Sequence, residues 1–132
     1  ELREAQIRAL AKAVDTEMIV YGRLPCMITE QCIIRNSAGR CNCTVPNNLA
    51  DRRGALFPVL PAFGHRSQIF NAHMLFLADK HEDYETAGRW GVRLMFTTET
   101  PHECVAVTQS YQGLTDYRPN GLTRGLYYRG VE

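Results

Sequence analysis

"EMIVYG", residues 17–22, is the stretch that most directly indicates the fold class. It is a short apolar run that ends at a glycine, which is typical of a buried β-strand. Residues 2–14 before it carry apolar side chains at the i, i+3, i+4 and i+7 spacing of a helix. A second apolar run, GVRLMFT at residues 91–97, is also predicted to be a strand. A helix that leads into a buried strand predicts an α/β protein.

Three further stretches are predicted to be extended. Residues 24–29 contain Pro25, which argues against a central position in a sheet because proline donates no backbone hydrogen bond. Residues 55–63 and 67–70 are also apolar and short. The segment between the first two, residues 30–55, is rich in Asn, Gly and Pro and is predicted to be a loop. A loop of that length in a small domain is usually functional.

Two helices are predicted in the second half of the chain. One begins at Asn71, a favourable N-cap residue, and extends to residue 88. The other follows Thr100, with Pro101 at the first helical position and Glu103 three residues after the cap. This combination is a capping box, a strong signal for the start of a helix.

Length and composition restrict the function classes. The 132 residues suffice for a single domain, residues 1–132, and 45% apolar with 22% charged residues is a globular composition. A net charge of +1 gives no electrostatic reason to expect nucleic acid or membrane partners. No apolar run approaches the roughly 20 residues of a membrane span. No signal-peptide pattern is present, so we expect a cytoplasmic protein; the missing initiator Met suggests a piece of a longer chain.

Thiols are the most specific chemical feature. Cys32, Cys41 and Cys43 lie within EQCIIRNSAGRCNC, residues 30–43, and His65 follows in another predicted loop. Three sulfurs and one imidazole form a tetrahedral set that zinc accepts, although the spacing is not that of a zinc finger. Free reactive thiols and a disulfide are the alternatives. The odd total of five cysteines argues against a disulfide framework, and we predict a metal site.

The remaining candidates are weaker. Cys26 and Cys104 are expected to be packing residues, since small thiols are often buried. Arginine suits carboxylate or phosphate and tyrosine can stack on a ring, so the tail is a candidate ligand site, with simple packing of its tyrosines as the alternative. The candidate substrate contacts are Arg23, Asn71, Arg124 and Tyr127. No phosphate loop, HExxH motif or nucleophile elbow is present, and no catalytic residue is assigned.

Four segments together resemble the collagenase-like peptidase family U-32, in the later part of its core domain. They are VYGRLPCMITEQC (20–32), LADRRGALFPV (49–59), RSQIFNAHMLFLADK (66–80) and TRGLYYRGV (123–131). The resemblance implies a fragment of a modified (β/α)8 TIM-type barrel, which needs about 250 residues when complete. The chain would supply the last strands and helices plus a long Cys-containing connection. Open barrel edges would favour a rearrangement of the fragment or a homo-oligomer.

The resemblance also implies a function. The nominal activity is hydrolysis of peptide bonds in a peptide or protein substrate, by an unresolved mechanism. Some members instead carry a four-cysteine [4Fe-4S] cluster and support hydroxylation of RNA bases or of an aromatic precursor; RNA is a partner only in that case. Cys32 matches a family cysteine, whereas His65 and Phe76 stand where members have cysteines. These departures favour zinc or an eroded site. A zinc-tied binding or structural module without catalysis is the third alternative.

Overall fold

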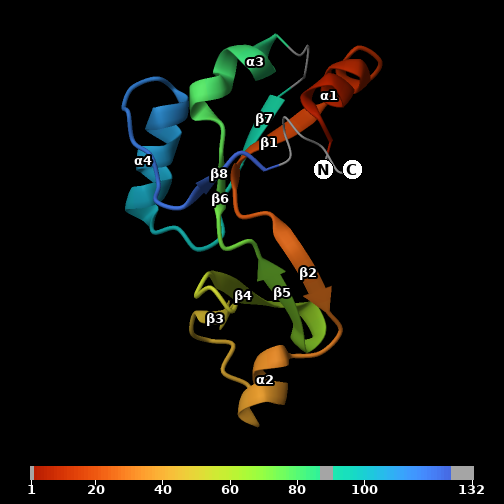
Figure 1. Ribbon diagram of the computed structural model, residues 1–132, viewed down its shortest axis with the longest axis vertical. Coiled ribbons are helices and arrows are strands. Elements are labelled where there is room, and N and C mark those ends of the chain that lie inside the picture. The colour runs from red at the N-terminus through yellow and green to blue at the C-terminus, as the bar shows by residue number, and fades with distance from the viewer. Residues whose placement is uncertain (1, 87–90, 126–132) are drawn as a thin grey trace. The chain divides into compact units, whose positions relative to one another are not determined.

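The structure is a computed structural model that describes residues 2–86 and 91–125. The chain divides into two units, which are described separately (Figure 1). The first consists of residues 1–22 and 74–132, and the second of Arg23–His73. Each unit contains one four-stranded sheet in its described part.

The sheet of the first unit is mixed and has the strand order β7-β1-β6-β8. Its strands are β1 (Glu17–Gly22), β6 (Met74–Phe76), β7 (Gly91–Met95) and β8 (Leu122–Thr123). β1 pairs in parallel with β7 and antiparallel with β6, while β6 pairs in parallel with β8. The strands predicted from EMIVYG and GVRLMFT are therefore confirmed, and they are neighbours in the sheet.

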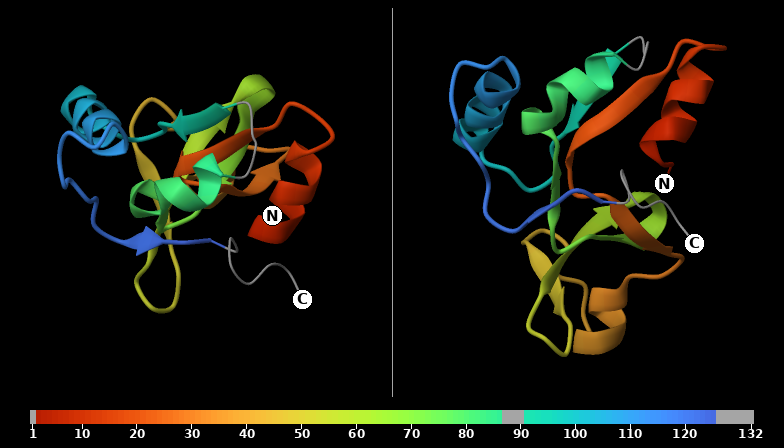
Figure 2. Two further views of the ribbon diagram at one scale, coloured as in Figure 1. Left: turned by 90° about the horizontal axis from the view of Figure 1, so that it is seen from above. Right: turned by 45° about the horizontal axis from the view of Figure 1, so that its top comes forward.

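Helices flank this sheet. They are α1 (Glu4–Ala11), the 3-10 helix η2 (Ala78–Lys80), α3 (His81–Glu85) and α4 (Pro101–Tyr111). The predicted capping box of α4 is confirmed: Thr100 Oγ1 accepts a hydrogen bond from Glu103 N, and the Glu103 carboxylate accepts one from Thr100 N. The blue helix α4 lies beside the strands in both views of Figure 2.

The core of the first unit forms between α4 and the sheet. Tyr21, Met74, Phe76 and Val107 are buried together, with Tyr111 packed against them. The rings of Phe76 and Tyr111 meet edge to face with centroids 5.6 Å apart. Such contacts add to the stabilisation from apolar burial.

The helix predicted from Asn71 is wrong over its first part. Met74–Phe76 form strand β6, and only Ala78–Lys80 and His81–Glu85 are helical. The reason is that four consecutive side chains, 74 to 77, are buried. An apolar run without helical or strand periodicity fits either element. Asn71 makes a local turn instead of capping a helix, because its Oδ1 accepts a hydrogen bond from His73 N.

The second unit is built on an antiparallel sheet with the order β2-β5-β4-β3. The strands are β2 (Pro25–Thr29), β3 (Asn47–Ala50), β4 (Leu56–Ala62) and β5 (Arg66–Phe70), and the short 3-10 helix η1 (Phe63–His65) joins the last two. β2 is an edge strand, as Pro25 indicated. β4 is central even though it contains Pro58 and Pro61.

The predicted loop at residues 30–55 contains two regular elements, so that prediction is partly wrong. They are the helix α2 (Ile33–Ala38) and strand β3. α2 begins with an unusual cap, because Cys32 Sγ accepts a hydrogen bond from Arg35 N. Cysteine is not among the residues that normally signal a helix start, so the start of α2 could not be predicted.

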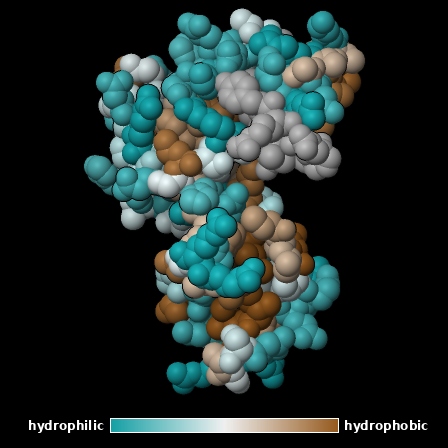
Figure 3. Space-filling model, in the orientation of Figure 1, coloured by the Kyte–Doolittle hydropathy of each residue, from teal (hydrophilic) through white to brown (hydrophobic). Residues whose placement is uncertain are grey.

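The α/β class is confirmed, and the sheets close no barrel within the two described ranges. In that part of the chain no helix has the length and apolarity to cross a membrane. Apolar side chains reach the surface in both units (Figure 3). In the second unit they include Met27, Ile28 and Phe63. The expected homo-oligomer stays a prediction.

Candidate metal centre

Three cysteines of the second unit converge on one point. The Sγ atoms of Cys32 and Cys41 are 3.9 Å apart, those of Cys32 and Cys43 3.4 Å, and those of Cys41 and Cys43 3.1 Å. All three are free thiols, of which Cys32 is buried, Cys43 half-buried and Cys41 exposed. Their sulfurs meet the geometric requirement for joint metal ligation, since all lie within 4.8 Å of one another.

The fold of residues 32–47 brings these thiols together. Cys32 lies at the start of α2, and Gly39 ends that helix with φ = 72°. This left-handed conformation suits glycine and reverses the chain, so that Cys41 returns to Cys32. Beyond the cysteines, the Asn47 side chain donates hydrogen bonds of 2.8 Å to the carbonyls of Asn42 and Val45. These contacts hold the segment between α2 and β3.

Hydrogen bonds within the cluster shift the pKa values of two of its thiols in opposite directions. The backbone N–H of Arg35 lowers the pKa of Cys32, because it stabilises the thiolate. The pKa of Cys43 is raised to about 12 by its contacts with Cys41 and Cys32 and by burial. Cys32 therefore loses its proton more readily than Cys43 does. A bound cation would take the place of those protons.

His65 lies on the same pocket as the thiols but outside the close group. The pocket has a volume of about 690 Å³, and its wall includes Cys32, Cys41, Gly64 and His65. The imidazole nitrogens do not belong to the set of ligand atoms within 4.8 Å of one another. Among the described residues other than glycine, His65 alone has a positive φ, 61°. That conformation costs energy in an L-residue and is frequent at functional sites.

Arg23 and Asn71 connect two segments of the second unit. The Arg23 guanidinium donates hydrogen bonds to the carbonyls of Asn71, at 2.9 Å, and Ala72. Asn71 N in turn donates to Leu24 O at 2.9 Å. These contacts join the start of β2 to the segment after β5, which is a structural role.

Arg124 is engaged within the first unit. Its guanidinium bonds both carboxylate oxygens of Asp79, one of them at 2.6 Å, and the Phe76 carbonyl at 3.3 Å. Tyr127 lies outside the described residues. Of the cysteines expected to pack, Cys104 is half-buried, whereas Cys26 is exposed. The latter expectation is wrong, because β2 is an edge strand whose residues 25–28 are exposed.

The Asp79–Arg124 pair predicts a pH dependence. Hydrogen bonding from Arg124 lowers the pKa of Asp79. The stabilisation is therefore present above the unfolded-state value of about 4 and is lost as pH falls through the lower folded-state value. Because both side chains are partly exposed, we expect the pair to contribute only about 0.5–1 kcal/mol to the free energy of unfolding. Urea unfolding of Asp79→Asn should show this loss at pH 7 and none of it at pH 2.

A control for that prediction is Glu82→Gln. Glu82 lies on α3 and forms no ion pair with the described residues. Its substitution should leave the difference between pH 7 and pH 2 unchanged. Equal effects of the two substitutions would contradict the role assigned to the pair.

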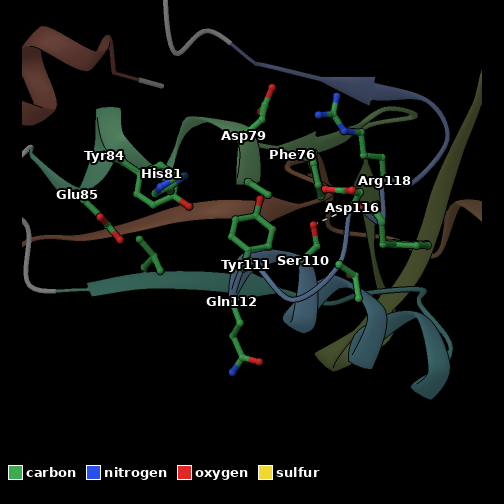
Figure 4. A pocket seen from close by; sticks show the side chains of 15 residues that line it. Phe76, Asp79, His81, Tyr84, Glu85, Ser110, Tyr111, Gln112, Asp116 and Arg118 are labelled. Atoms are coloured by element: carbon green, nitrogen blue, oxygen red, sulfur yellow. Dashed lines mark hydrogen bonds between the residues drawn. The ribbon is translucent and has the colours of Figure 1, made fainter.

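The first unit has a cavity of its own, of about 500 Å³, shown in Figure 4. Tyr111 is at its centre, and its hydroxyl donates to Val20 O at 2.6 Å and accepts from Leu77 N at 2.9 Å. Ser110 Oγ donates to Tyr117 O at 3.0 Å. These hydroxyls are committed to the fold, and burial raises the pKa of Tyr111. These two hydroxyls are therefore unavailable for chemistry, although the cavity wall also carries His81, Glu85, Asp116 and Arg118.

Comparison of the chain with protein-family models, with curated proteins and with solved structures gave no match. The thiol cluster is consequently argued from geometry alone. Sequence reasoning selected its three cysteines but missed Arg35 and Arg40, which also line the pocket. Their signal was present in the sequence, because both lie in the segment that joins the cysteines.

Proposed function

We propose that Cys32, Cys41 and Cys43 bind one zinc ion. The observation that carries this is the set of sulfur separations, 3.1–3.9 Å. Zinc–sulfur bonds of about 2.3 Å in a tetrahedron put the sulfurs about 3.8 Å apart. Thiolates that each ligate a different iron of a [4Fe-4S] cluster must stand farther apart, so a single ion is favoured.

His65 is the proposed fourth ligand. It shares the pocket wall with Cys32 and Cys41, and three cysteines with one histidine are an established structural zinc set. The strained backbone of His65 supports a role beyond packing. Ligation by His65 requires the η1 turn to move the imidazole to the ion, which would then tie β4 and β5 to α2.

We further propose that this centre belongs to a U-32-type peptidase, and that peptide hydrolysis is the activity of the complete protein. The four quoted segments support this proposal. Zinc in such a protein can stabilise structure or polarise a carbonyl. Iron–sulfur-dependent hydroxylation and a zinc-tied module without catalysis are the competing functions.

Metal analysis after anaerobic purification separates these proposals. We expect one zinc per chain and no visible absorption band. Detection of iron and sulfide, with a broad absorption band at the blue end of the spectrum, would indicate an iron–sulfur cluster instead of zinc. A chain without metal would overturn the site. Separately, a complete protein that is free of contaminating proteases and cleaves no denatured collagen would contradict the peptidase proposal while leaving the zinc site intact.

Replacement of His65 by alanine should weaken zinc binding without abolishing it. With three thiolates retained, we expect the dissociation constant to rise at least about tenfold. Competition with a chromogenic chelator measures this change. His73→Ala is the matched control, since His73 is exposed and lies outside the pocket. Identical affinities of the two variants would exclude His65 from the centre.

A further inference from the structure

The pocket beside the thiols is rich in hydrogen-bond donors. Its wall includes Arg35, Arg40 and His65, and among the described residues that line it only Glu30 is acidic. Glu30 already forms an ion pair of 2.8 Å with Arg66. Neither Arg35 nor Arg40 forms an ion pair with a carboxylate of the described chain. Two arginines of this wall therefore have no anionic partner among residues 2–86 and 91–125.

A neutral side chain adds to this excess of donors. The Gln31 Oε1 atom accepts a hydrogen bond of 3.0 Å from Asn36 Nδ2. Its carbonyl is therefore engaged, and its own amide N–H groups remain as donors. Gln31 and Asn36 both belong to the pocket wall.

Charge is unevenly distributed between the two units. Residues 23–73 contain six arginines, no lysine and two acidic residues, which gives a formal charge of +4. Because the whole chain carries +1, the first unit carries −3. The near-neutral total therefore conceals a basic unit. A basic concave surface concentrates anions by electrostatic attraction.

We propose that this pocket binds an organic carboxylate, of the kind carried by a peptide C-terminus, with Arg35 and Arg40 as its anchors. The planar guanidinium group matches a carboxylate with two parallel hydrogen bonds. A volume of about 690 Å³ accommodates a small organic molecule, not merely an inorganic ion. The inference rests on the proposed metal centre in one respect: with zinc bound, the ion and its three thiolates together carry only −1, so the two arginines still leave an excess of positive charge.

Calorimetric titration with N-acetyl-diglycine tests the proposal on the zinc-loaded chain. Its C-terminal amide is the matched neutral ligand, and inorganic phosphate is the competing anion. We expect the carboxylate to bind and the amide not to bind. The double variant Arg35→Gln/Arg40→Gln should weaken carboxylate binding at least tenfold while retaining zinc. Arg53→Gln, which removes an arginine of the same unit outside the pocket, should bind as the unmodified chain does.

Several results would overturn the assignment. Equal binding of the acid and the amide would show that the pocket does not recognise a carboxylate. Unchanged binding by the double variant would exclude Arg35 and Arg40 as its anchors. Tighter binding of inorganic phosphate than of the peptide acid would make the pocket a phosphate site. Zinc content is measured in every sample, so failure of the metal centre is recognised separately. Should the chain hold no zinc, the same titration on the metal-free chain decides whether the pocket binds a carboxylate.

Discussion

Cys32→Ser is expected to lower the affinity of the chain for zinc by roughly a hundredfold or more. Cys32 is the buried member of the thiol set, and its sulfur lies 3.9 Å and 3.4 Å from those of Cys41 and Cys43. Loss of one of four ligands removes about a quarter of the 10–16 kcal/mol typical of a structural zinc site, or roughly a hundredfold or more in affinity. A hydroxyl does not replace it, because thiolate is the softer ligand and far more readily deprotonated.

The same substitution should also make the segment between α2 and β3 less stable. Cys32 Sγ accepts the Arg35 N–H at 3.4 Å, so the serine hydroxyl can still cap α2. Any loss of stability therefore reports metal loss and not loss of the helix cap. Zinc content, and the effect of a chelator on hydrogen exchange of residues 32–47, measure the two consequences.

Cys26→Ser is the control for that experiment. Cys26 is exposed on β2 and lies outside the thiol group. The zinc content of the Cys26→Ser variant, and its response to a chelator, should equal those of the unmodified chain. A Cys32→Ser variant that binds zinc as tightly as the unmodified chain, in competition with a chromogenic chelator, would contradict the proposed centre.

Among Gly→Ala substitutions at Gly22, Gly39, Gly54, Gly64, Gly91 and Gly113, we expect Gly22→Ala to cause the largest loss of folding stability. Gly22 ends β1 with φ = 128°, a conformation that other residues rarely adopt. A Cβ atom there would lie 2.2 Å from the backbone oxygen of Met95 and 3.0 Å from its Cβ. Because the first contact is with backbone, relief requires β1 and β7 to separate. We expect a loss of about 3 kcal/mol in the free energy of unfolding.

Gly113→Ala separates the contact from the backbone strain. Gly113 also has a positive φ, 73°, but an added Cβ would meet nothing within 4 Å. Only the cost of a left-handed residue, about 1 kcal/mol, should appear in urea unfolding. Equal losses in the two variants would show that the approach of β7 to β1 does not determine the effect.

The parts of the fold that could be predicted are those with a local cause. The strand at residues 17–22 and the helix after Thr100 were found because an apolar run or a capping box acts within a few residues. Strand β6 was assigned to a helix because its burial is decided by β1 and β8, which are distant in sequence. The start of α2 was missed because its cap is a thiol.

The candidate site shows the same division. Clustering of Cys32, Cys41 and Cys43 could be predicted because they are near one another in the chain. The position of His65 relative to them depends on the pairing of β4 with β5 and on the η1 turn, which spacing alone does not determine. The pocket role of Arg35 and Arg40 depends on the reversal at Gly39.

The register of β1 with β6 has a consequence for how this chain can change. Gly22 is paired with Leu75, so the polypeptide leaves the first sheet and re-enters it on adjacent strands. The 51 residues between them, Arg23–His73, are therefore a cassette whose two ends already lie together. We expect that this segment can be lengthened, exchanged or replaced by a tight turn while the strand pairs of the first unit are retained. The three clustered thiols thus belong to a segment that is separate from the strand pairing of the first sheet.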